Sequence, residues 1–106
     1  MRKTQVSLPR RQLVELMQRI NYGAIENLEV RNGEPVLDPI PVVLRDIALG
    51  RANGPHPAVH RRDFELKSEV VELFALFDRE QDVRISLVVV QAGLPLRVRV
   101  RVTEIA

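Results

Sequence analysis

The chain of 106 residues contains no cysteine and no tryptophan, and its aromatic residues are one tyrosine and three phenylalanines. Without cysteine it can form no disulfide, no thiolate metal site and no thiol nucleophile. No apolar run approaches the roughly 18 residues of a membrane-spanning helix, and the first residues lead into no hydrophobic stretch typical of a signal peptide. We therefore expect a cytoplasmic protein with no membrane partner, which packing alone stabilises.

Motifs for catalysis are missing as well. The sequence has no Gly-x-Ser-x-Gly, and the glycines of Gly50-Arg51-Ala52-Asn53-Gly54 lack the Lys-Ser/Thr that completes a phosphate-binding loop. The two histidines, His56 and His60, are four residues apart, which suits two metal ligands on one helix. Prolines on both sides of His56 argue against that helix and favour ordinary loop histidines. We predict a non-enzymatic protein with no catalytic residue, no cofactor and no metal site.

The composition is that of an ordinary globular protein, with 45% apolar and 28% charged residues. The length predicts a single domain over residues 1–106. The net charge is only +2, and all 16 basic residues except Lys3 and Lys67 are arginine. Arginine suits bidentate binding of phosphate or carboxylate, although a GC-rich genome would produce the same bias.

The first half of the sequence predicts a helix followed by a hairpin. Ser7 is a typical N-cap, Pro9 suits a first turn, and apolar residues recur at helical spacing until Gly23 closes the helix. Residues 25–30 then predict a strand, and Asn32-Gly33 favours the positive φ angles of a tight turn. Residues 34–37 are the expected return strand.

The second half predicts the same order of elements. Asp63 is the expected cap of a second helix, residues 83–90 are rich in β-branched residues, and residues 91–94 predict a turn. Residues 95–103 alternate as a strand does. The apolar positions of the second helix are Leu66, Val70, Leu73, Phe74 and Phe77.

The halves, about 8–38 and 63–104, match each other in two places. Residues 13–16 match residues 70–73, and residues 30–36 match residues 90–96, with a slip of three residues that we place at 78–82. The match predicts an α+β fold of duplicated α-β-β units, with an antiparallel sheet of four to five strands and both helices on one face. A chance match of short apolar patterns is the alternative.

An irregular segment, residues 39–62, joins the halves. Its prolines 39 and 41 exclude a helix there, and residues 50–57 have the composition of a loop. We interpret residues 42–49 as an edge strand rather than as a short helix.

From Ile20-Asn21-Tyr22-Gly23 to Val30-Arg31-Asn32-Gly33 the chain resembles the YezD-like small bacterial proteins. The shared pattern is a short helix, a break at an aromatic residue and a glycine, a strand, and a hairpin that contains glycine. The resemblance covers about a quarter of the chain, and residues 42–62 and the second half depart from it. It implies the hairpin and no activity.

Arginine alternates with apolar residues from Leu96 to Val102, which places Arg97, Arg99 and Arg101 on one face of a strand. Their spacing of about 6.6–6.8 Å is close to that of successive phosphates, so these three arginines are candidate nucleic-acid contacts. Alternatively they form a solvated surface or pair with a carboxylate such as Glu29. The chain also offers few aromatic residues for base stacking.

The run Leu87, Val88, Val89 and Val90 is apolar at every position, which predicts a strand covered on both faces. Two short helices can cover only one face. A second copy of the chain is the expected cover, either face to face or edge to edge, and the alternative is that residues 42–49 fold over the far face. We therefore predict a binding or regulatory module that acts by protein–protein interaction, as a homodimer or with another protein, and nucleic-acid binding is the alternative.

Overall fold

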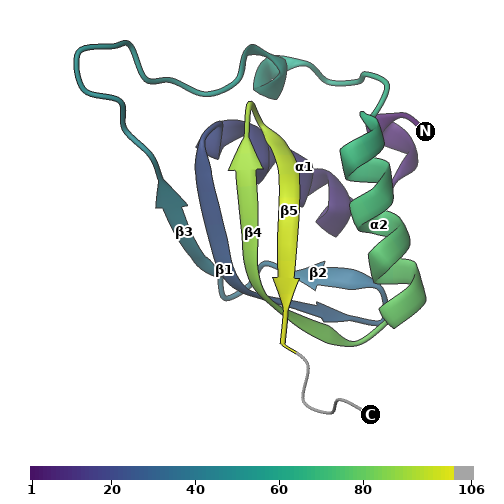
Figure 1. The fold of residues 1–106 in the computed structure, drawn as a ribbon. Coiled ribbons are helices and arrows are strands. Elements are labelled where there is room, and N and C mark those ends of the chain that lie inside the picture. Colours follow the sequence, from purple (N-terminus) through teal and green to yellow (C-terminus); the bar gives the residue numbers. More distant parts are fainter. Residues whose placement is uncertain (102–106) are drawn as a thin grey trace.

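Two helices pack against one side of a five-stranded antiparallel sheet in the computed structural model, which describes residues 1–101 (Figure 1). The predicted α+β fold class is confirmed. The elements in chain order are η1 Lys3–Gln5, α1 Leu8–Ile20, β1 Gly23–Arg31, β2 Glu34–Val36, β3 Val42–Arg45, η2 Pro57–His60, α2 Ser68–Glu80, β4 Val83–Gln91 and β5 Leu94–Val100.

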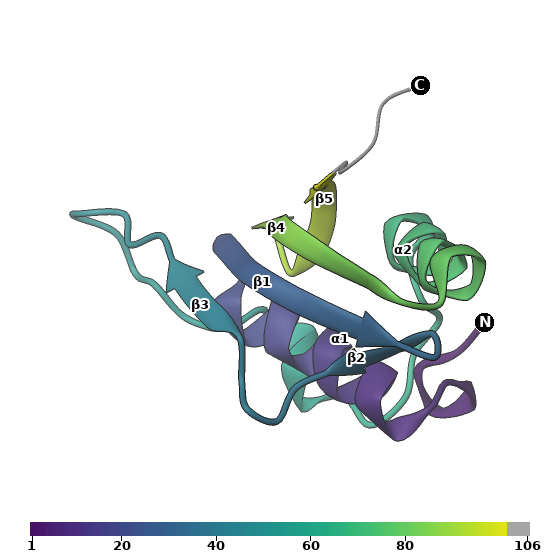
Figure 2. The ribbon, with the colours of Figure 1, turned by 90° about the horizontal axis from the view of Figure 1, so that it is seen from below.

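The long strands β1 and β4 pair at the centre of the sheet, whose order is β2-β1-β4-β5. The outer edge of β1 is shared, because β2 pairs with residues 29–31 and β3 pairs with residues 23–26. The expected edge strand is therefore present over Val42–Arg45, and the chain after it runs out beyond the sheet as a loop (Figure 2). Gly23 allows this arrangement, since a Cβ there would clash with the carbonyl oxygen of Leu44.

From the helix to the hairpin turn, the elements of the two halves correspond at a constant offset of 60 residues, although the positive φ of Asn27 has no equivalent at Leu87. Leu8 and Ser68 begin helices of 13 residues, and β1 and β4 each have nine residues. The hairpin glycines Gly33 and Gly93 have φ angles of 76° and 75°. The three-residue slip predicted from the sequence is therefore wrong. It arose because a shift of about one turn lays the apolar stripe of a helix onto itself.

An approximate two-fold axis relates the halves. Between β1 and β4, Gly23 pairs with Val90 and Val30 pairs with Val83, so equivalent positions exchange partners. The hairpin turns do the same with the helix ends. The Gly33 N–H donates to the Gln81 carbonyl at 2.8 Å, and the Gly93 N–H donates to the Asn21 carbonyl at 2.9 Å. Each half thus holds the turn of the other.

The core lies between the helices and the sheet. Asn27 has a positive φ of 57°, and the buried positions of β1 shift there from Ile25 to Leu28, so both sections of the strand face the helices. The apolar positions predicted for both helices are buried, except Leu16, which is partly buried, and Leu66 is buried but lies before α2. The fully buried large side chains are Phe77, Leu13, Met17, Ile25, Leu28, Ile85, Val14, Val30, Val88 and Val90.

The N-cap predicted for the first helix is confirmed, and the N-cap predicted for the second helix is wrong. Ser7 caps α1, since its Oγ accepts from the Arg10 N–H at 3.3 Å. Asp63 does not cap α2, which begins five residues later at Ser68 with Lys67 as its N-cap. Asp63 accepts instead from Arg2 Nε at 2.7 Å and from the Thr4 N–H at 3.2 Å.

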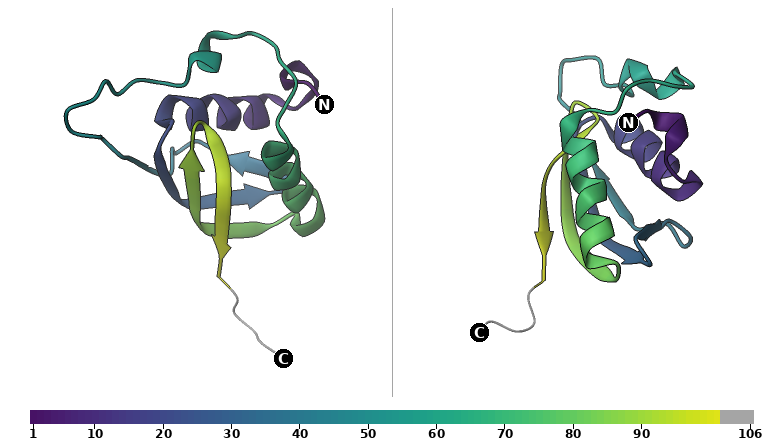
Figure 3. Two further views of the ribbon diagram at one scale, coloured as in Figure 1. Left: turned by 45° about the horizontal axis from the view of Figure 1, so that its top comes forward. Right: turned by 90° about the vertical axis from the view of Figure 1, so that its right-hand side faces the viewer.

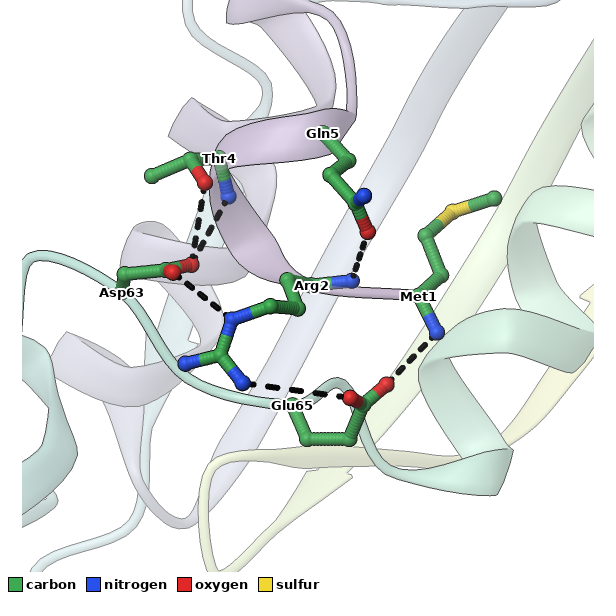
Figure 4. Close-up of polar contacts among 6 residues, drawn as sticks. All are labelled: Met1, Arg2, Thr4, Gln5, Asp63 and Glu65. Carbon is green, nitrogen blue, oxygen red and sulfur yellow. Dashed lines mark hydrogen bonds and ion pairs between the residues drawn. The ribbon is translucent and has the colours of Figure 1, made fainter.

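These contacts belong to a clasp between the N-terminal residues and residues 63–66 (Figure 4). The Met1 ammonium pairs with Glu65 at 2.6 Å, and Arg2 Nη1 lies 4.0 Å from the same carboxylate. The Leu66 N–H donates to the Met1 carbonyl at 2.8 Å. The guanidinium of Arg2 and the hydrogen bonds from Thr4 lower the pKa of Asp63 to about 2. The clasp fixes the start of the second half against the first.

Candidate functional site

Both helices lie on one side of the sheet, and no helix of residues 1–101 covers the other side (Figure 3, right). Residues paired directly across antiparallel strands point to the same face. The buried residues Ile25, Val88 and Ile85 point to the helices, so their strand neighbours point away. We call the uncovered side the bare face. Two of its cross-strand rows are Leu44, Ala24, Val89, Arg97 and Val42, Glu26, Leu87, Arg99.

Each row changes character from one edge of the sheet to the other. The β3 end is apolar, with Val42 and Leu44 about half exposed at 49% and 45%. Leu87 and Val89 continue this stripe across β4 and are partly exposed. The β5 end is cationic. These two rows are therefore apolar apart from Glu26 on β1, and they end at one basic border.

The candidate arginines lie at that basic border, on the face that the alternation predicted. Arg97 and Arg99 are exposed on β5, and Arg101 follows the end of the strand and is exposed as well. Within residues 1–101 none of the three forms an ion pair. Glu29, the predicted partner, pairs with Arg31 at 2.7 Å and lies 3.8 Å from Arg84 instead.

The candidate self-association run is divided between two environments. Val88 and Val90 point into the core and are 0% and 1% exposed, so they offer no surface. Leu87 and Val89 lie on the bare face. The candidate surface is therefore narrower on β4 than the sequence suggested. It is wider elsewhere, because it includes Val42 and Leu44 of β3.

Residues 40–49 do not fold over the bare face. The strand β3 widens the sheet at its edge, and this segment carries a cluster of exposed apolar side chains. Sequence reasoning placed a strand there but missed this surface. The sequence pattern that could have revealed this surface is the run of apolar residues at consecutive positions in a strand that no helix covers. The exposed side chains are Ile40, Val42, Val43, Leu44, Ile47 and Leu49, with exposures from 37% to 92%.

Two of the phenylalanines and one of the histidines are engaged within the fold. Phe74 and Phe77 are in the core. His56 caps the 3-10 helix η2, whose presence corrects the prediction of a non-helical stretch, and its Nδ1 accepts from the Ala58 N–H at 3.1 Å. His60 is the last residue of η2. Over the described residues no group of three or more His, Asp or Glu side chains could hold a metal.

Neither α1 nor α2 has the length and apolar character needed to cross a membrane, and the described residues contain no other α-helix. No protein-family model, no curated protein and no solved structure matches the chain. The resemblance to the YezD-like proteins therefore stays a prediction.

Proposed function

We propose that this chain is a non-catalytic binding module that self-associates through its bare face. The observation that carries the proposal is the apolar stripe from Val42 and Leu44 on β3 to Leu87 and Val89 on β4. Exposed apolar stripes of this kind mark interaction surfaces in proteins that otherwise bury such residues. A second sheet stacked on the face would remove the stripe from water.

Charge complementarity favours a second copy of the chain as the occupant. A two-fold axis parallel to the strands and running along β4 would lay β5 of one copy over β1 of the other. Arg97 and Arg99, which lack ion pairs within residues 1–101, would then lie over the side of the face that carries Glu26. Apolar residues would meet at the centre, and the charges would fix the orientation.

The test is the molar mass in solution, measured by sedimentation over a range of protein concentrations. The wild-type chain should form dimers as the concentration rises. Val89→Asp should remain a monomer, because a carboxylate would be desolvated in the stripe. Val71→Asp is the matched control, since Val71 is an exposed valine on α2, and it should dimerise normally. A wild-type chain that stays monomeric at every concentration would exclude the proposal.

The same measurement separates face-to-face from edge-to-edge pairing. The Asp46 N–H donates to the Tyr22 carbonyl, so the alternation of an antiparallel ladder turns the Val43 N–H away from β1. Val43→Pro would therefore block an added strand and leave the bare face intact. A dimer that survives Val43→Pro and is lost in Val89→Asp supports face-to-face packing. The opposite result assigns the interface to the β3 edge.

Nucleic-acid binding through Arg97, Arg99 and Arg101 is the second candidate. It is favoured by the lack of ion pairs at these residues within the described chain. A fluorescence-anisotropy titration with pooled short DNA and RNA tests it, at low and near-physiological salt. Binding should weaken steeply as salt rises and disappear when all three arginines become Gln. The same variant should weaken the dimer less than tenfold, since exposed charge pairs contribute little.

We also propose that the two halves are copies of one α-β-β unit. The constant offset of 60 residues and the exchanged partners across the two-fold axis support this. The lack of cysteine suits the proposed cytoplasmic location. Between residues 8–38 and 68–98 the identical pairs are Leu13 and Leu73, Leu16 and Leu76, Arg19 and Arg79, Ile25 and Ile85, Val30 and Val90, Gly33 and Gly93, and Pro35 and Pro95.

A further inference from the structure

The side chain of Arg10 fills a space between α1 and the elements of the second half. Its Nη2 donates to the Gly33 carbonyl at 2.8 Å and pairs with the Asp78 carboxylate at 2.6 Å. The guanidinium lies over the Phe74 ring, 5.1 Å from its centroid. Only 12% of the side chain is exposed. Arg10 is thus an enclosed guanidinium over an aromatic ring, with the Gly33 carbonyl, the Asp78 carboxylate and, at 3.9 Å, the Glu34 carboxylate as its oxygen partners.

The approximate two-fold axis generates a second such space, and there the guanidinium is missing. Val70 stands at the position of Arg10, and its short side chain cannot reach the oxygen atoms. A cavity of about 480 Å³ occupies this place, within the size range of small-molecule sites. The cavity is lined by the equivalents of Arg10, Gly33, Asp78 and Phe74, which are Val70, Gly93, Gln18 and Val14.

One residue of the lining, Gln18, carries a buried hydrogen-bond acceptor. Gln18 is 6% exposed, and its Oε1 is buried with no hydrogen-bond partner in the described chain. Gln18 occupies the position equivalent to Asp78, whose carboxylate accepts a hydrogen bond from Arg10 in the other half. Buried acceptors without partners are rare in proteins, and one that lines a cavity favours a ligand with a donor. A guanidinium is the donor that the equivalent space holds.

The outer end of the cavity offers positive charge. Arg61 and Lys67 are exposed residues of the lining and have no ion pair within residues 1–101. His56 adds a donor, because its Nδ1 accepts from Ala58 and its Nε2 then carries the proton. Glu65 also lines the cavity, but the clasp already pairs it with the Met1 ammonium. This end therefore suits a carboxylate.

We propose that the cavity binds a small guanidino acid. The guanidinium would lie against Gln18 and Gly93 over Val14, as Arg10 lies against Asp78 and Gly33 over Phe74. The carboxylate would face Arg61 and Lys67. The cavity is on the helix side of the sheet, so this binding is independent of self-association through the bare face.

L-arginine is the probe, titrated into the full chain at millimolar concentrations and followed by the backbone amide signals in NMR spectra. We expect saturable shifts centred on residues 18, 70 and 93. Agmatine, which lacks the carboxylate, should bind several-fold more weakly, and L-citrulline, which lacks the positive charge, should bind at least tenfold more weakly. No saturation with L-arginine, or acetate and phosphate binding as well as L-arginine does, would overturn the proposal.

Val70→Arg should fill the cavity as Arg10 fills its equivalent and should weaken binding at least tenfold. Its matched control is Val71→Arg, one residue along α2 on the exposed side, which should leave binding unchanged. Gln18→Asp should strengthen binding several-fold, because it restores the carboxylate that Asp78 supplies in the other half. Since Gln18→Asp gains affinity, it tests the site even if Val70→Arg disturbs the fold. Binding that neither substitution changes would place the ligand elsewhere and overturn the proposal.

Discussion

The two halves share the same order and lengths of elements from the helix to the hairpin turn and then diverge at the return strand. The strand β5 continues from Leu94 to Val100, whereas β2 stops at Val36 and β3 takes over at the same edge of the sheet. The difference lies in the residues after the turn, where prolines 39 and 41 replace Arg99 and Arg101. Core and turns thus set the common structure, and the strands at the edges carry the candidate surfaces.

The side chains that fill the space around the two-fold axis differ as well. One half places a guanidinium between helix and turn, and the other half leaves a cavity. Shared backbone geometry therefore makes each half a control for the other. Substituting equivalent residues one at a time, and comparing the effects on stability, measures how far the two residues have the same role.

The largest effect is expected in the core, at the equivalent residues Met17 and Phe77, which are both 0% exposed. Phe77→Ala should lower the free energy of unfolding by about 3–5 kcal/mol. Met17→Ala should cost less, roughly 2–4 kcal/mol, because it removes fewer atoms. Urea unfolding followed by circular dichroism measures both. If Met17→Ala cost more, the centre of the core would lie under α1 rather than under α2.

A second substitution exchanges the residues that begin the central strands. Gly23→Val gives β1 the residue that β4 has at Val83, but its side chain would meet the Leu44 carbonyl and the Ile20 side chain. We expect a loss of roughly 1–3 kcal/mol in the free energy of unfolding. Hydrogen exchange should show β3 amides released from β1. Val83→Ala is the control, and unchanged protection of β3 in Gly23→Val would contradict this account.

Much of the fold could be predicted from the sequence, because its signals are local. Ser7 caps its helix, Asn32-Gly33 forms its turn, and the alternation along β5 places Arg97 and Arg99 on the face away from the core. The prediction that Asp63 caps the second helix was wrong, although aspartate is a good capping residue. A partner 61 residues away, Arg2, engages its carboxylate, and local propensity cannot foresee such a contact.

The candidate sites were less predictable. Leu87 and Val89 were identified on β4, but only the pairing of β3 with β1 brings Val42 and Leu44 into the same surface. The cavity had no sequence signal, since Val70 is an ordinary apolar residue of a helix. It becomes visible only when Val70 is compared with Arg10 across the two-fold axis.

The hairpin turns offer a smaller and reciprocal test. Asn32 and Ala92 have nearly equal positive φ angles of 52° and 51°, a conformation that asparagine tolerates better than alanine. Ala92→Asn should raise the free energy of unfolding by roughly 0.5–1 kcal/mol, and Asn32→Ala should lower it by about as much. Urea midpoints measure both changes. An increase in Asn32→Ala would mean that contacts of the Asn32 side chain outweigh its backbone preference.

The smallest effect concerns the clasp, in which the segments that precede the two helices pair. The pKa of Asp63 is about 2 against an ordinary value of 3.8, because Arg2 and Thr4 stabilise its carboxylate. A carboxyl with a lowered pKa in the folded state stabilises fully above pH 3.8 and loses that contribution as the pH falls toward 2. The wild-type urea midpoint should therefore decrease between pH 4 and pH 2. Asp63→Asn should decrease less over this range, whereas Glu69→Gln, which leaves the clasp intact, should retain most of the decrease. Equal pH dependence in Asp63→Asn and the wild-type chain would show that the clasp is open in solution.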